Sequence, residues 1–112
     1  MSDVVPNRDE IVVYVTAPNE DEAAGIAKAL VEARLAACVN IINNIRSIYR
    51  WQDKLEDDSE VLMIIKTRRE LFDPLTVEVK KLHSYDVPEI IALPISLGSE
   101  DYIKWIREST GK

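Results

Sequence analysis

The sequence predicts an α+β fold with the element order β-α-β-β-α-β followed by a C-terminal helix. Two observations carry this prediction. Short β-branched and aromatic runs alternate with longer segments whose apolar residues recur at helical spacing. The chain also has 112 residues, of which 46% are hydrophobic and 30% charged, and this is the size and balance of one globular domain.

The first half of the chain predicts a strand followed by a helix. Residues 10–17 (EIVVYVTA) read as a buried strand that stops at Pro18, after a loose polar lead-in over residues 1–9. Asn19 is typical of a helix N-cap, and Glu22 stands where a capping box places its acid. The apolar stripe of this helix has helical spacing and consists of Ala23, Ile26, Ala27, Leu30, Ala33 and Ala37.

Two further strands are predicted in the middle of the chain. Residues 38–51 form the longer one, and period two places one set of its side chains on a single face: Val39, Ile41, Ile45, Tyr49 and Trp51. Residues 52–59 are polar and acidic, which predicts a hairpin connection. Residues 60–67 (EVLMIIKT) are nearly all apolar, as expected of a central strand.

The last part of the chain predicts a helix over residues 71–82, a strand over residues 89–95 and a final short helix. Pro94 has no N–H to donate, so the strand that holds it belongs at a sheet edge. Ser99 is expected to cap the last helix, whose inward residues would be Tyr102, Ile103 and Ile106. This order is the ferredoxin-like split β-α-β, an antiparallel sheet with helices on one face, and residues 10–112 form its single domain.

Composition excludes several functions and predicts a location. The formal net charge of −6 disfavours nucleic acid as a partner, and no run approaches the ~20 apolar residues of a membrane span. The single cysteine, Cys38, cannot form an internal disulfide, and the first residues hold no signal-peptide run, so we expect a cytoplasmic protein. Iron–sulfur, zinc and phosphate-loop motifs are missing, as is a catalytic triad, so we predict that the protein is not an enzyme and has no obligatory cofactor.

Several residues stand out, each with a structural alternative. Cys38 reads first as a small buried core residue, and His83 as an imidazole at a helix C-terminus. Glu89 follows a turn and is equally consistent with an exposed edge carboxylate. Tyr49 and Trp51 lie on the part of strand 38–51 expected to overhang the sheet, which favours an oligomer interface.

The sequence resembles the CutA (divalent-cation tolerance) family. The matching segments run in family order over about residues 11–107 and comprise Thr16-Ala17-Pro18, Arg34–Asn40, Ser47–Trp51, Lys66-Thr67, His83–Glu89 and Tyr102–Ile106. The resemblance implies a ferredoxin-like fold, a homotrimer, and an association with tolerance of copper and other divalent metals. Val15 occupies a position where some members carry a cysteine. The family's usual His-Pro-Tyr is His83-Ser84-Tyr85 in this chain, so a serine replaces the proline.

Two hypotheses of function follow. The first is a metal-binding homotrimer in which His83 and Glu89 bracket a turn and hold Cu²⁺ or another divalent cation weakly. Because Val15 is not a soft ligand, Cu⁺ is expected to bind poorly. The alternative is a trimeric signalling or scaffold protein, similar to the PII-like proteins, which binds a small anionic ligand in an inter-subunit cleft. The candidate cleft residues are Cys38, Trp51, Lys66 and Tyr85.

Overall fold

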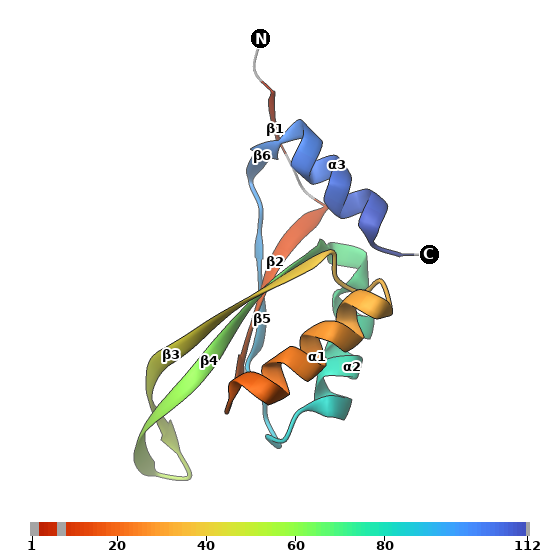
Figure 1. The fold of residues 1–112 in the computed structure, drawn as a ribbon. Helices are drawn as coiled ribbons and strands as arrows, with labels where there is room; N and C mark the ends of the chain where they lie inside the picture. The colour runs from red at the N-terminus through yellow and green to blue at the C-terminus, as the bar shows by residue number, and fades with distance from the viewer. Residues whose placement is uncertain (1–2, 7–8, 112) are drawn as a thin grey trace.

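The computed structural model describes residues 3–6 and 9–111 and confirms the predicted α+β fold. A four-stranded antiparallel sheet has the strand order β3-β4-β2-β5, which is the ferredoxin-like order. Helices α1 and α2 cover one face of it (Figure 1). The elements of this layer are β2 (Glu10–Ala17), α1 (Glu20–Glu32), β3 (Cys38–Trp51), β4 (Lys54–Arg68), the 3₁₀ turn η1 (Arg69–Leu71), α2 (Phe72–Leu82) and β5 (Ile90–Pro94).

The core lies between the helices and the two central strands. Side chains at alternate positions of β2 and β4 are fully buried, as the period of two requires. They pack against Ile26 and Leu30 of α1 and against Leu75 and Val79 of α2. Asn19 caps α1 as predicted, accepting a hydrogen bond from the Glu22 N–H at 2.8 Å. None of the described helices is long and apolar enough to cross a membrane.

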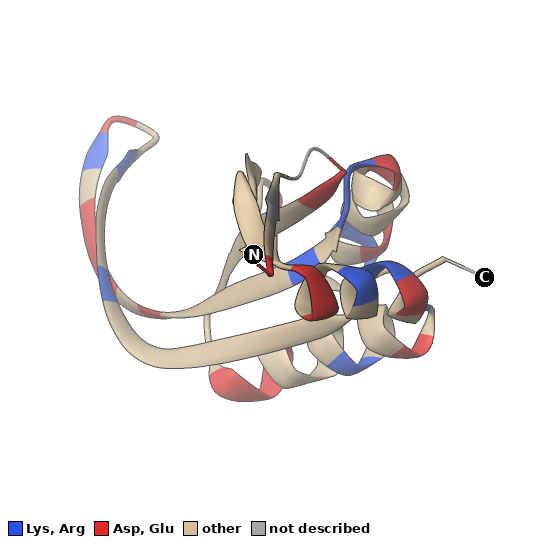
Figure 2. Ribbon diagram, turned by 90° about the horizontal axis from the view of Figure 1, so that it is seen from above, with Lys and Arg blue, Asp and Glu red and all other residues tan. Residues whose placement is uncertain are grey.

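Strands β3 and β4 extend beyond the sheet as a two-stranded hairpin arm, defined here as residues 45–60. The predicted connection over residues 52–59 is wrong, because only Gln52 and Asp53 form the turn and β4 begins at Lys54. Both turn residues have positive φ, 50° and 63°, as a tight two-residue hairpin turn requires. The overhang of β3 is present as predicted, but the matching extension of β4 was not predicted, because its side chains are mostly exposed and its apolar residues do not alternate. Figure 2 shows the arm curving away from the body.

A β-bulge changes which face the arm presents. Val39 and Ile41 pair with core residues of β4, but the register shifts between Ile42 and Ile45. One extra residue moves the following side chains to the other face of the sheet. The prediction that Val39, Ile41, Ile45, Tyr49 and Trp51 share one face is therefore wrong, and the last three lie on the face away from the helices.

A second small sheet and a helix occupy the two chain ends. Part of the predicted lead-in is not loose, because β1 (Val4–Pro6) pairs antiparallel with β6 (Leu97–Ser99). Ser99 caps α3 (Glu100–Ser109) as predicted, and Ile103 and Ile106 are buried. Tyr102 was expected inward but is 42% exposed. Strand β5, which holds Pro94, lies at a sheet edge as predicted.

Candidate functional site

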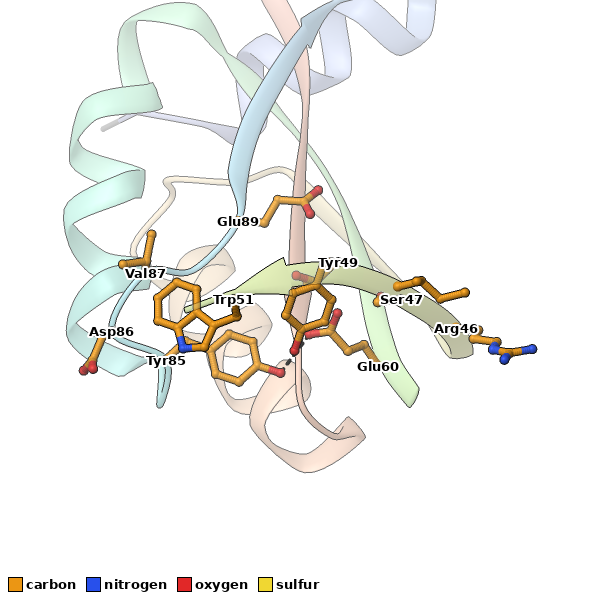
Figure 3. A pocket seen from close by; sticks show the side chains of 11 residues that line it. Arg46, Ser47, Tyr49, Trp51, Glu60, Tyr85, Asp86, Val87 and Glu89 are labelled. Carbon is orange, nitrogen blue, oxygen red and sulfur yellow. Dashed lines mark hydrogen bonds between the residues drawn. The ribbon is translucent and has the colours of Figure 1, made fainter. Parts of the chain in front are cut away.

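A cavity of about 720 Å³ lies between the arm and the loop that joins α2 to β5 (Figure 3). Both walls follow from the local sequence. The bulge turns the aromatic residues of β3 toward this face, and the turn before Pro88 brings the loop against it. The lining residues are Thr16, Arg46, Ser47, Ile48, Tyr49, Trp51, Glu60, Tyr85, Asp86, Val87 and Glu89.

The cavity is acidic. Three carboxylates line it, Glu60, Asp86 and Glu89, against one guanidinium, that of Arg46. The Arg46 side chain is already paired with Asp57 through Nε to Oδ1 at 2.9 Å and through a second bond at 2.7 Å. This double hydrogen bond raises the pKa of Arg46 and lowers the pKa of Asp57. The field inside the cavity therefore favours a cation over an anion.

Tyr85 and Glu60 form a partly buried polar contact in the cavity. The Tyr85 hydroxyl donates to Glu60 Oε2 at 2.7 Å, and the Glu60 residue is only 6% exposed. Burial of the phenol, followed by the hydrogen bond to the Glu60 carboxylate, raises the pKa of Tyr85. Tyr85 therefore remains a neutral donor at all ordinary pH values and keeps Glu60 in place.

Tyr49 makes the corresponding contact on the arm. Its hydroxyl donates to Asp58 Oδ2 at 2.7 Å, and this hydrogen bond is the main reason that the pKa of Tyr49 is raised to about 12. Both tyrosine hydroxyls are thus committed to carboxylates, which leaves the rings of Tyr49 and Tyr85 as walls of the cavity (Figure 3).

His83 is buried and has no free ring nitrogen. Its Nε2–H donates to the Thr16 carbonyl at 2.7 Å, and its Nδ1 accepts from the Tyr85 N–H at 3.1 Å. Its side chain is 0% exposed, and Nδ1 lies 3.4 Å from a Glu22 carboxylate oxygen. Nε2 must carry the proton to donate to a carbonyl, so the neutral ring uses both nitrogens within the fold. His83 is not among the residues that line the cavity.

The predicted pair of metal ligands is therefore not assembled. Glu89 is exposed at the cavity mouth before β5, whereas His83 is closed off behind the loop. Within residues 3–6 and 9–111, no three His, Cys, Asp or Glu side chains are grouped so as to hold a metal ion. The cavity offers oxygen ligands to a divalent ion, but one chain supplies too few of them for tight binding.

The structure also divides the predicted cleft residues into two groups. Trp51 and Tyr85 line the cavity, but Cys38 and Lys66 face each other across β3 and β4 at the other end of the sheet. There, Lys66 donates to Asn40, and the Cys38 sulfur lies 3.9 Å from the same Asn40 side-chain oxygen. Within one chain, Lys66 therefore does not line the cavity and cannot bind an anion there.

The arm carries the apolar side chains expected of an interface. Tyr49 and Trp51 are 39% and 43% exposed, and Ile48 and Leu55 are 59% and 75% exposed.

Sequence reasoning missed Glu60, because an acid at the start of an apolar run reads as a strand boundary. The only signal was its position next to the acidic stretch, which does not reveal burial.

These features define the class as a ferredoxin-like protein with a long hairpin arm beside an acidic aromatic cavity. Residues 11–109 match the family described as CutA1 divalent ion tolerance protein, and the chain belongs to this family. The chain is 54% identical to the divalent-cation tolerance protein CutA of Thermus thermophilus over 91% of this chain and 99% of that one. The solved Thermus thermophilus structure superposes with a TM-score of 0.89.

Two relatives bear on location. The chain is 53% identical to the chloroplastic protein CutA of Arabidopsis thaliana over 89% of this chain, and it spans only about half of that relative, 55% of its length. The structure of the periplasmic divalent cation tolerance protein CutA from Archaeoglobus fulgidus is 46% identical over 89% of this chain and 97% of that one, with a TM-score of 0.87. The cytoplasmic prediction is therefore wrong, because relatives are named for the chloroplast and the periplasm. A single unpaired cysteine does not distinguish one compartment from another.

Proposed function

We propose that this chain acts in divalent-cation tolerance as a homotrimer without catalytic activity, and that it binds divalent cations weakly at the acidic cavity. The observation that carries the proposal is the cavity itself, in a chain that belongs to a family of divalent ion tolerance proteins. Among the described residues none of the three carboxylates forms an ion pair, and the arginine of the lining is already paired with Asp57. A dication would relieve this imbalance.

The trimer is supported by the hairpin arm. Strand β3 is an edge strand of 14 residues, and an edge of this length is normally covered. The arm adds Ile48, Tyr49, Trp51 and Leu55 as exposed apolar side chains, a patch typical of subunit interfaces. Light scattering at micromolar concentration should give a mass three times the 12.7 kDa of one chain. A mass of one chain would contradict the trimer.

The weak affinity follows from the ligand set. Carboxylates and water are hard ligands, and the affinity order of divalent ions still places Cu²⁺ first among the common ones. Cu⁺ should bind poorly, since no sulfur ligand lines the cavity among the described residues. Val15, where some relatives are expected to carry a cysteine, is fully buried in the core.

Calorimetry of Cu²⁺ into the assembled protein tests the site. Glu89→Gln should weaken Cu²⁺ binding, because the change removes a charge at the cavity mouth and preserves the shape of the side chain. Glu32→Gln is the matched control, since Glu32 is exposed at the end of α1, outside the cavity lining. Equal affinity of wild type and Glu89→Gln, or loss of binding in the control, would remove the cavity from the proposal.

A further inference from the structure

The Glu60 carboxylate is only half satisfied. Its Oε2 accepts from Tyr85, but the structure gives Oε1 no hydrogen-bond donor within the described residues. No lysine or arginine of the described chain is paired with it. Among the described residues, the only buried side-chain oxygen without a partner is Thr76 Oγ1, so Glu60 Oε1 is not closed off inside the protein and is open to the cavity that Glu60 lines. The cavity therefore has a place for a positively charged hydrogen-bond donor.

The walls of the cavity select the kind of donor. Figure 3 shows the rings of Trp51, Tyr49 and Tyr85 together on one side of the cavity, with the Tyr85 hydroxyl pointing to Glu60. Tyr85 is held from behind by the His83 ring, with ring centroids 4.8 Å apart. Aromatic faces attract a cation through the ring quadrupole, most strongly in tryptophan. They also provide an apolar surface for methylene groups. A hydrated metal ion does not use such a surface.

A bare dication uses little of this arrangement. It needs several oxygen ligands at short distances, and no such group of three is present in the described part of the chain. The cavity of about 720 Å³ is also far larger than one ion requires. An alkylammonium group, by contrast, has three N–H donors for the carboxylate and a stem for the rings.

We propose that the acidic aromatic cavity binds a protonated primary amine, whose ammonium group donates to Glu60 Oε1 and whose methylene stem lies against Trp51. The inference rests on the proposed function only in using the same cavity. The amine belongs either to a free diamine or to a lysine side chain of another polypeptide. Because Glu89 stands at the mouth of the same cavity, the amine and a divalent cation compete for it.

Calorimetry of the 112-residue chain in its native assembly tests this with three probes. Putrescine represents a free diamine, Nα-acetyl-lysine-N-methylamide represents a protein lysine, and 1,4-butanediol is the uncharged control. We expect at least one amine to bind and the diol not to bind. Binding of putrescine alone identifies a free amine as the ligand, and binding of the lysine derivative alone identifies a polypeptide. Binding of neither amine overturns the proposal.

Two variants fix the position. Glu60→Gln keeps the shape of the side chain and should lower amine affinity at least tenfold, whereas the control Glu32→Gln should leave it unchanged. Tyr85→Phe removes the hydroxyl that holds Glu60 in place but keeps the carboxylate, so it should weaken amine binding by less than Glu60→Gln does. Unchanged affinity in both Glu60→Gln and Tyr85→Phe would place the amine elsewhere.

The same instrument separates this proposal from the proposed function. Cu²⁺ binding without amine binding removes the amine site and leaves the divalent-cation role intact. Amine binding without Cu²⁺ binding removes the divalent-cation role of the cavity and leaves the amine site intact. A side chain from a neighbouring copy that fills the cavity would abolish amine binding in the assembled protein, and that outcome also overturns the proposal.

Discussion

Replacement of His83 should destabilise the fold without changing cation affinity. The imidazole joins the loop after α2 to strand β2 through a buried hydrogen bond of 2.7 Å to the Thr16 carbonyl, and within the loop it accepts a partly buried one of 3.1 Å from the Tyr85 N–H. The ladder between β2 and β5 ends at Val15, one residue before this carbonyl. His83 therefore supplies the hydrogen-bond donor for the Thr16 carbonyl at the point where β5 no longer pairs with β2.

The size of the effect follows from these contacts. His83→Ala leaves the buried Thr16 carbonyl without this partner, at a cost of about 1–3 kcal/mol, and the partly buried Tyr85 N–H without its acceptor, at a smaller cost. The space left by a side chain that is 0% exposed adds a cavity cost, so a total loss of about 3–5 kcal/mol is expected. Because domains of this kind have roughly 5–15 kcal/mol in total, His83→Ala should unfold at clearly lower urea concentration.

Two polar replacements separate the contacts. The amide nitrogen of His83→Gln can still donate toward the Thr16 carbonyl, and the amide oxygen of His83→Asn can still accept from the Tyr85 N–H. Each should recover part of the loss measured for His83→Ala, at fixed protein concentration because assembly affects the midpoint. Cu²⁺ calorimetry on the folded variants should match wild type. A variant of unchanged stability that no longer binds Cu²⁺ would refute the reasoning and make His83 a ligand.

Three other outcomes are expected. Trp51→Ala should weaken assembly by about 2 kcal/mol or more and Trp105→Ala by less, because Trp51 lies on the arm; equal dissociation on dilution would contradict this. Asp58→Asn should lower the pKa of Tyr49 from about 12 toward 10.0, since the anionic acceptor favours the neutral phenol up to that pH; an unchanged ultraviolet titration would count against it. Asp53→Gly should stabilise the chain by about 0.5 kcal/mol, because φ is 63° there; a lower urea midpoint would argue otherwise.

The sequence predicts the sheet and main helices because burial leaves a pattern. Strands β2 and β4 alternate or run apolar where they face α1 and α2, and the caps at Asn19 and Ser99 are local chemistry. The arm leaves no such pattern, since neither of its faces is buried within one chain. Strands β1 and β6 pair through the backbone over three residues each, too few for periodicity to indicate.

The candidate site was only partly predictable for the same reason. Trp51, Tyr85 and Glu89 were identified and do line the cavity. Cys38 and Lys66 were grouped with them, but the three-dimensional path of β3 carries its two ends to opposite ends of the sheet. The bulge at Asn43 and Asn44 and the burial of Glu60 depend on tertiary packing, which residue types alone do not reveal.

The two tryptophans provide the most direct test of the claim that the acidic cavity is the cation site. Trp51 lines the cavity, whereas Trp105 stacks with Tyr102 on α3, with ring centroids 5.4 Å apart. The measurement is the line width of both indole N–H signals during titration with paramagnetic Cu²⁺. Selective broadening of the Trp51 signal, reduced by Glu89→Gln, is the predicted result. Equal broadening of both signals, or earlier broadening of the Trp105 signal, would contradict the account.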